Sequence, residues 1–131
     1  MVFQSFALKG VPFLVQSASD HHCLVLTVRF FRTEAGNEPV RDWLGQLPRG
    51  HRQLIGTEIK TVQIGWPLGM PLVRKMERGL WEVRVDLGDS CARILFTLVR
   101  DVMVLLHGFI KKSQKTPAAD LETARQRKSR L

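Results

Sequence analysis

Apolar and polar residues follow two different periods along this chain, and the change of period predicts an α+β fold. Residues 24–31 are rich in β-branched and aromatic side chains, which is typical of a strand. Apolar residues then recur at intervals of three and four over residues 39–47, after a capping Asn37 and a first-turn proline, and again over residues 52–64. We therefore expect one strand followed by two amphipathic helices, separated at Pro48–Gly50.

The middle of the chain changes to a period of two, which indicates strands. Leu80–Asp86 alternates between apolar and polar side chains, and Ala92–Val99 and Val102–Ile110 are two further apolar-rich segments joined by short turns. Residues 69–79, which carry three basic side chains between glycines, are expected to form a loop. The prediction is a three-stranded antiparallel meander over residues 80–110.

A last helix is predicted after Thr116, which would cap it, and Pro117, which suits a first helical turn. The expected order is β-α-α-β-β-β-α, with an antiparallel-dominated sheet of about four strands, two N-terminal helices packed on it and a C-terminal helix. Residues 26–131 then form one domain, which the length of 131 residues also favours. Residues 1–25 lack a sustained period and are expected to be a poorly ordered extension.

Composition narrows the classes of function. The longest apolar run, Val102–Leu106, has five residues, whereas a transmembrane helix needs ~20, so we expect no membrane anchor. The first residues lack the features of a signal peptide, which favours a cytoplasmic protein. The two cysteines, Cys23 and Cys91, cannot form the disulfide framework of a secreted domain. His21–Cys23 has no second ligand cluster at zinc-like spacing, so we expect no metal.

The charge of the chain is unevenly distributed. The net charge is +8, and the segment from Lys111 to Leu131 alone holds seven basic and two acidic residues. Such a concentration favours a polyanionic partner, of which nucleic acid is the commonest. A solvated basic tail without a partner is the alternative that charge alone leaves open.

Two arginines stand out within the predicted meander. Arg84 and Arg93 lie on neighbouring strands, and their side chains share a face of the sheet if the register allows. Cations brought together in this way repel one another unless an anion lies between them, and a phosphodiester is such an anion. For Arg84 the alternative is an ion pair with Glu82 or Asp86. Arg93 is flanked by apolar residues, and a half-buried arginine needs a partner.

The other candidate residues follow on the third strand of the meander. His107 alternates with apolar residues, which favours a hydrogen-bonded core histidine, although an imidazole also suits a general base. Lys111 and Lys112, taken alone, are typical of a solvated strand end. The chain has no phosphate-binding glycine loop, serine-nucleophile elbow or zinc-protease motif. Metal-free RNA cleavage needs none of these, because the substrate 2′-hydroxyl is the nucleophile and cationic side chains stabilise the transition state.

Several of these segments together resemble a known family. Gly79–Arg84 (G-L-W-E-V-R), Arg93–Phe96 and Leu105–Pro117, which contains H-G-F-I-K-K-S-Q-K-T-P, are similar to segments of the RelE/HigB toxin superfamily. The likeness is to its phage-derived HigB-like branch. It extends over Arg29–Arg127 and includes the predicted helix over residues 37–47.

The resemblance implies a RelE-like fold and the toxin of a type II toxin–antitoxin system. Such toxins are endoribonucleases (mRNA interferases) that cut mRNA in the A site of the translating 70S ribosome, where they contact 16S rRNA. They need no metal or other cofactor, and they leave a 2′,3′-cyclic phosphate and a 5′-hydroxyl. A helix-turn-helix antitoxin of the HigA kind neutralises them. Self-association of this chain stays open.

The resemblance also assigns roles by position. Catalytic roles fall on Arg84, Arg93, Lys111 and Lys112, with His107 as the candidate acid or base. To these we add Arg74, Lys75, Gln114 and Lys115 as candidate RNA-binding residues. The chain has no tyrosine, whereas some members of the superfamily place one near the C-terminus. A second hypothesis is therefore a non-catalytic basic module of the same fold that binds RNA or protein.

Overall fold

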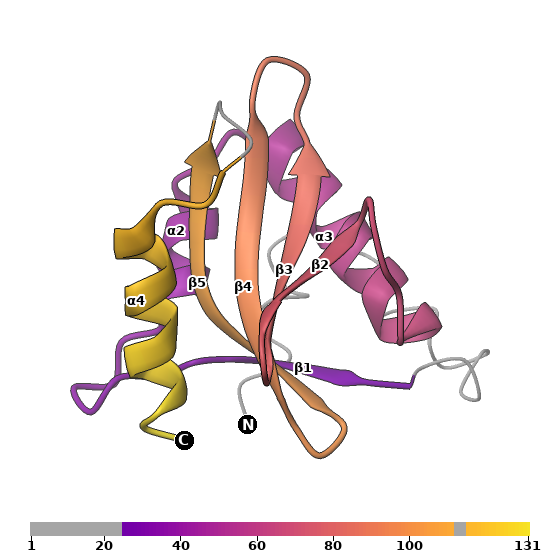
Figure 1. Cartoon of the computed structure of the whole chain (residues 1–131). Helices are drawn as coiled ribbons and strands as arrows, with labels where there is room; N and C mark the ends of the chain where they lie inside the picture. The colour runs from indigo at the N-terminus through magenta and orange to yellow at the C-terminus, as the bar shows by residue number, and fades with distance from the viewer. Residues whose placement is uncertain (1–24, 112–114) are drawn as a thin grey trace.

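The computed structural model of the chain describes residues 25–111 and 115–131. The expected extension over residues 1–25 therefore lies outside the described residues, except for Val25. The described chain has an α+β fold, which confirms the predicted class (Figure 1). Its elements, in order, are β1 (Thr27–Phe30), α2 (Pro39–Gly45), α3 (Arg49–Gly65), β2 (Val73–Glu77), β3 (Leu80–Asp86), β4 (Cys91–Val99), β5 (Val102–Lys111) and α4 (Ala118–Lys128).

One mixed sheet forms the middle of the molecule. Its five strands have the order β1-β5-β4-β3-β2. The strands from β2 to β5 are antiparallel to their neighbours along the chain, as the predicted meander requires, and β1 pairs with β5 in parallel. The two-residue connection at Arg100–Asp101 joins β4 to β5 where the sequence placed it.

Several local predictions are wrong. The expected loop over residues 69–79 contains the edge strand β2, which the sequence hid because Val73 is its only deeply buried residue. The second helix begins at Arg49, three residues earlier than expected, because Pro48 is its N-cap and not a separate break. The N-cap of α2 is Glu38 instead of Asn37, and it makes no side-chain capping bond.

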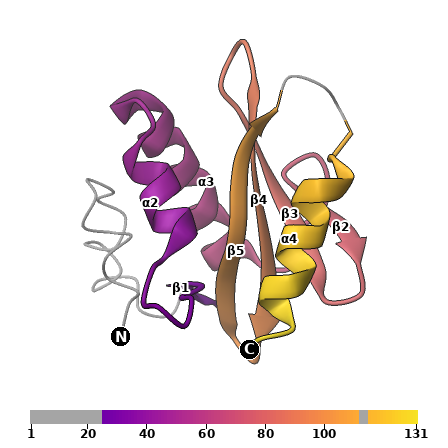
Figure 2. The same ribbon diagram turned by 90° about the vertical axis from the view of Figure 1, so that its left-hand side faces the viewer.

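Helices cover both faces of the sheet, as Figure 2 shows. α2 and α3 pack on one face, over a core that includes Val83, Ile94 and Leu105. α4 packs on the other face, over a smaller core of Phe31, Leu80, Leu95, Val104, Leu106 and Ala124. We call this second side the α4 face. In the parts of the chain that the structure describes, no helix combines the length and apolar character needed to cross a bilayer.

Candidate functional site

The register of the sheet brings the two candidate arginines together. Arg84 on β3 lies directly opposite Arg93 on β4, and Arg93 lies opposite Phe109 on β5. Residues paired in this way point to the same side of a sheet. This side is the α4 face, because Leu95, two residues after Arg93, belongs to the α4 core. The condition on register in the sequence argument is therefore met.

A buried carboxylate lies between the two arginines. Glu82, on the same face of β3, is 0% exposed, and its Oε1 is 3.7 Å from Nε of Arg84. Its Oε2 is 4.0 Å from Nη1 of Arg93. The Glu82 carboxylate therefore supplies part of the negative charge that two neighbouring guanidinium groups require. The ion pair between Arg84 and Glu82 that the sequence left open is present.

A threonine hydroxyl completes this network. Oγ1 of Thr116 donates to Oε2 of Glu82 at 2.6 Å and accepts from Nη1 of Arg93 at 3.1 Å. Thr116 was expected to cap the last helix, but the N-cap of α4 is Pro117, without a side-chain capping bond. The hydroxyl is turned into the sheet instead. We call Glu82, Arg84, Arg93 and Thr116 the arginine network.

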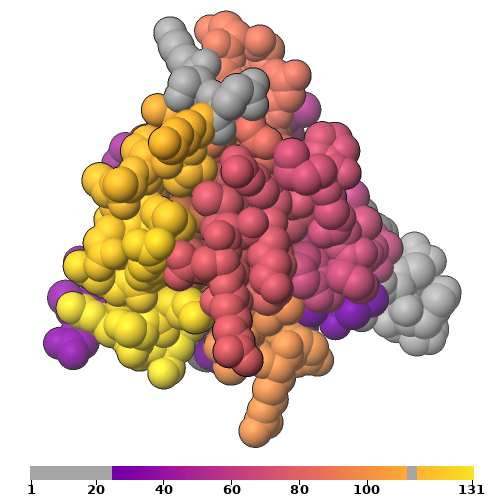
Figure 3. All heavy atoms as spheres, viewed as in Figure 1, coloured from indigo at the N-terminus to yellow at the C-terminus, as the bar shows by residue number. Residues whose placement is uncertain are grey.

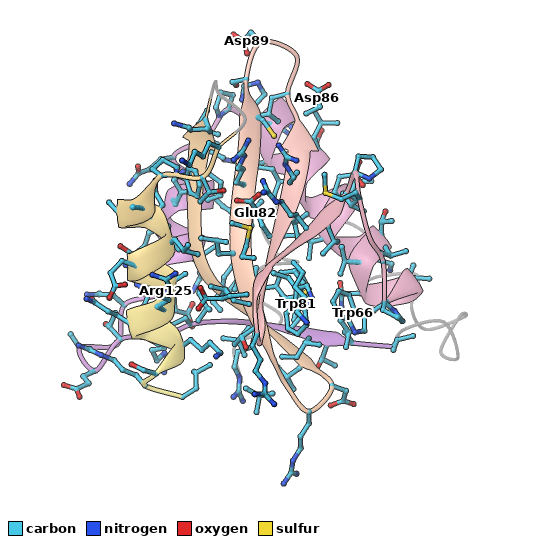
Figure 4. The ribbon with its side chains drawn as sticks, in the orientation of Figure 1. Trp66, Trp81, Glu82, Asp86, Asp89 and Arg125 are labelled. Carbon is cyan, nitrogen blue, oxygen red and sulfur yellow. The ribbon has the colours of Figure 1, made fainter. Side chains whose placement is uncertain are left out.

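The network borders a cavity of about 620 Å³, within the ~300–1,000 Å³ usual for ligand sites. Its lining includes Arg84, Arg93 and Lys111, which come from three adjacent strands. Asp86 and Asp89 at the β3–β4 hairpin also line it. Figure 4 places Glu82 near the middle of the sheet, with these two aspartates further toward the hairpin. The cavity therefore offers donors for phosphate oxygens beside carboxylates that can accept hydrogen bonds.

The two arginines differ in their access to this cavity. The side chain of Arg84 is 15% exposed, whereas that of Arg93 is 1% exposed. A ligand entering the cavity can therefore contact Arg84 directly, while Arg93 is almost wholly enclosed by protein. Arg93 instead contacts protein groups, among them Thr116 and Glu82. These polar contacts explain how a charged residue is accommodated in an otherwise apolar strand.

His107 lies in a second polar cluster on the α4 face. Its Nε2 is 2.7 Å from Oδ1 of Asp120, and its Nδ1 is 3.4 Å from Nη1 of Arg127. A guanidinium can only donate, so in the neutral imidazole Nδ1 accepts and Nε2 carries the proton that is donated to Asp120. The ring of Phe109 stacks on the imidazole at 5.6 Å. These contacts match the hydrogen-bonded histidine that the sequence favoured.

Arg127 also ties α4 to the sheet. Its Nη1 donates to the backbone oxygen of Leu106 at 2.8 Å, and its guanidinium carbon lies 5.9 Å from the centre of the Phe31 ring. Burial lowers the pKa of Arg127, because the charged form loses solvation. The contacts among His107, Asp120 and Arg127 therefore hold α4 against β5, on the same face of the sheet as the arginine network.

The remaining candidates are distributed over both sides of the sheet. Arg74 on β2 lies opposite Glu82 and so belongs to the α4 face, whereas Lys75 lies opposite Trp81, which packs on the α2–α3 core. Lys111 borders the cavity, and Lys115 is exposed just before Thr116. Lys112 and Gln114 lie outside the described residues.

Comparison with known proteins identifies the family. The family model described as phage-derived protein Gp49-like (DUF891) matches residues 42–129, a span that contains the whole arginine network. The chain belongs to the Gp49-like family. This RelE-like, toxin-type family confirms the broader part of the resemblance found in the sequence. Among curated proteins, no sequence matches this Gp49-like chain.

Several residues of the Gp49-like site carried too weak a signal in the sequence. Thr116 was missed because a threonine before a proline is also the ordinary start of a helix. Asp120 and Arg127 were missed because their partner His107 is 13 and 20 residues away along the chain. Glu82 was named only as a surface partner of Arg84, because it alternates with Trp81 and Val83, a pattern that predicts a solvent-facing side chain.

Proposed function

We propose that this Gp49-like protein is the toxin of a type II toxin–antitoxin system. In this proposal it is a HigB-like, metal-independent mRNA endoribonuclease that acts on translating ribosomes. One observation carries the proposal: a chain of this toxin-type family aligns Arg84 with Arg93 beside a cavity that Lys111 also borders. Clustered guanidinium and ammonium groups are suited to the extra negative charge that develops on a phosphate during RNA cleavage.

The proposed reaction uses the RNA as its own nucleophile. The 2′-oxygen attacks the adjacent phosphorus, the bond from phosphorus to the 5′-oxygen breaks, and a 2′,3′-cyclic phosphate forms. The proton lost from the 2′-hydroxyl is matched by one gained at the departing 5′-oxygen, so that no water or metal is consumed. Arg84 and Lys111 would contact the non-bridging phosphate oxygens. Lys112, which follows directly, and Arg93 complete the proposed set of cations.

His107 is the proposed acid or base. It would first have to release Asp120 or Arg127, because both of its ring nitrogens are engaged in the resting enzyme. The ring lies on the same face as Glu82, opposite Leu95 on β4. Release of Arg127 would free Nδ1 while Asp120 still orients the ring.

The proposed partners follow from the same function. The protein would meet mRNA in the ribosomal A site and contact 16S rRNA of the 70S ribosome through Arg74, Gln114 and Lys115. Lys75 was expected to join them, but it points to the opposite side of the sheet and is not part of the proposed contact. A helix-turn-helix antitoxin of the HigA kind would neutralise it. We propose a cytoplasmic location for the pair, since translating ribosomes are there.

The engagement of His107 also favours a second function. If neither ring nitrogen is released, the chain has no tyrosine to replace the imidazole in proton transfer. The same fold would then be a non-catalytic basic module that grips RNA or a partner protein. Both candidates require the cationic cavity, and only the first requires turnover.

Primer extension on a defined mRNA, in a reconstituted translation reaction with and without ribosomes, separates these functions. We expect cuts within codons only when ribosomes are present. Arg84→Ala should lower cleavage by on the order of 100-fold, because it removes a preorganised donor to the phosphate. Arg49→Ala removes an equal charge at the start of α3, where Arg49 is exposed, and should leave cleavage unchanged.

Three other results would revise the proposal. Cuts on free RNA would keep the nuclease and remove the ribosome from its mechanism. Equal losses in Arg84→Ala and Arg49→Ala would show that total charge matters and the cavity does not. Absence of cleavage at every protein concentration would overturn the nuclease and leave the binding module.

A further inference from the structure

We infer that Glu82 and Thr116 are positioning residues, which set the geometry of the arginines and hold the chain just before α4 against the sheet. This inference rests on the proposed function, because it concerns how the same site is kept in order. Neither residue would touch RNA. Glu82 is 0% exposed, and Thr116 is buried beside it.

The first step is that the two oxygens of the Glu82 carboxylate have different partners. Its two oxygens face different cations: Oε1 is nearest Arg84, and Oε2 is bonded to Thr116 and lies near Arg93. A buried carboxylate is unfavourable unless it is paired and hydrogen-bonded. Once paired, it constrains both guanidinium groups, and so the more exposed Arg84 has a fixed direction toward the cavity.

The second step concerns the direction of the hydrogen bonds at Thr116. The hydroxyl has one proton, which it donates to Glu82, and it accepts from Arg93 with a lone pair. Only a side chain that both donates and accepts at this point can join an acid to an arginine. Serine keeps this ability, whereas valine has the shape of threonine without it.

The third step concerns the lysine directly before Thr116. Lys115 is exposed, and the Thr116 hydroxyl is bonded to Glu82 and Arg93. The backbone next to Lys115 is therefore held close to the same carboxylate that orients Arg84. Lys111, at the end of β5, borders the cavity independently of this contact.

The consequence is a specific kinetic signature. Loss of the Thr116 hydroxyl leaves every cation of the site in place, so the overall attraction of RNA to a protein of net charge +8 should persist. The alignment of the cations with the phosphate is lost instead. The maximal rate should therefore fall, while the concentration of substrate giving half that rate should stay nearly constant.

The chain offers a matched control in Thr97. Thr97 lies on the α4 face of β4, is buried, and donates its hydroxyl to the backbone oxygen of Gly79 at 2.6 Å. Thr97→Val removes a buried hydroxyl bond of similar length without touching the arginine network. A purely structural role for Thr116 predicts that the two valine variants behave alike.

The test is single-turnover cleavage by wild type, Thr116→Val, Thr116→Ser and Thr97→Val, on the substrate that the wild type cuts. We expect Thr116→Val to lose on the order of 100-fold in maximal rate, since small misplacements of catalytic groups have effects of this size. Thr116→Ser should recover most of that loss, and Thr97→Val should keep the wild-type rate. Wild-type cleavage by Thr116→Val, or an equal loss in Thr97→Val, would overturn the inference.

Glu82→Gln is a second test of the inference, in case the Thr116→Val protein does not fold. It keeps the volume of the side chain and removes the charge, so we expect the maximal rate to fall as it does in Thr116→Val. Thermal unfolding identifies the variants that remain folded. A folded Glu82→Gln protein that cleaves at the wild-type rate would contradict the positioning role.

A spectroscopic arm separates this inference from the proposed function. If the wild type cuts no RNA, the nuclease proposal fails, and the ¹⁵N-resolved Nε–H signals of Arg84 and Arg93 become the readout. Thr116→Val should shift both signals, Thr116→Ser should restore them, and Thr97→Val should leave them in place. Unchanged arginine signals in Thr116→Val would refute the anchoring role independently of any activity.

Discussion

The backbone of β5 passes directly beneath the ring of Trp43 at Gly108. A Cβ atom on Gly108 would overlap Cε3 and Cζ3 of that ring, which belongs to α2. The glycine beside His107 is therefore a packing requirement of the α2–α3 face, while its neighbour on either side points to the α4 face. Within one short motif, alternate residues serve the core and the candidate site.

This close approach predicts a large effect of a single methyl group. Gly108→Ala should lower the free energy of unfolding by about 1–3 kcal/mol, because the partly buried tryptophan must move away from β5 and lose its contact with the core. Urea unfolding followed by far-UV circular dichroism measures this change.

Gly50→Ala is the control for Gly108→Ala. Gly50 lies in the first turn of α3, and a Cβ there meets nothing within 4 Å. We expect this variant to be neutral or stabilised by up to about 1 kcal/mol. Equal stability of Gly108→Ala and the wild type would mean that Trp43 does not rest on β5 as described.

At the same scale, the sequence predicted the face that Arg84 and Arg93 share, but not the contacts that they make. Alternation along the strands was enough to put Arg84 and Arg93 on one face, provided the register was favourable. The sequence did not predict the roles of Glu82 and Thr116, because Thr116 lies 34 residues from Glu82 and 23 from Arg93 along the chain. Hydrogen bonds over such separations depend on tertiary packing, which no local pattern contains.

Among the elements, β3, β4 and β5 were predicted to within a residue, β1 begins three residues later than expected, and the edge strand β2 was not predicted. β3, β4 and β5 have apolar residues that meet the two cores, so their period is visible in the sequence. β2 forms the edge of the sheet and exposes Arg74 and Lys75. Because a charged edge discourages unwanted pairing with other chains, such strands lack the pattern by which strands are recognised.

Although β2 is an edge strand, an ion pair joins it to the last helix, α4. Glu77, at the end of β2, accepts from Nε and Nη2 of Arg125 on α4, at 3.0 and 2.8 Å. The space-filling view shows β2 lying between α4 and α3 on this side of the molecule (Figure 3). The hydrogen bond from Arg125 is the main cause that lowers the pKa of Glu77, opposed by a smaller effect of burial.

The lowered pKa predicts how this contact responds to acid. The unfolded chain takes up the proton of Glu77 first, near its ordinary pKa of 4.5, and the folded chain takes it up only at lower pH. The stability contributed by the ionised form is therefore complete above that value and is lost as the pH falls through the lowered pKa. The difference in Tm between wild type and Glu77→Gln should be constant near neutral pH and vanish in acid.

Glu34→Gln provides the comparison, since it removes an exposed carboxylate from the turn before α2. Its Tm should follow that of the wild type over the whole pH range. A Tm difference for Glu77→Gln that persists in strong acid would show that the ion pair with Arg125 does not contribute the stability in question.

On the scale of the whole molecule, the larger apolar core and the candidate site lie on opposite faces of the sheet. The α2–α3 side holds the larger apolar core and most of the aromatic packing, including Trp66, Trp81 and Phe96. The α4 side combines a small core with the arginine network and the His107 cluster. The edge strand β2 carries one basic residue toward each side of the sheet, so the face proposed to bind RNA can be tested.

Adjacent residues Arg74 and Lys75 provide that test. Both are exposed and basic, but Arg74 points to the α4 face and Lys75 to the α2–α3 face. If RNA lies across the α4 face, Arg74→Ala should weaken binding of a short single-stranded RNA. It should also reduce the slope of log K against log salt by about 0.7, the share of one phosphate contact. Lys75→Ala should change neither quantity, despite the same loss of charge.

If Lys75→Ala weakens binding and Arg74→Ala does not, RNA lies on the α2–α3 side, away from the arginine network. Equal effects of the two variants would mean that only the net charge of +8 attracts RNA.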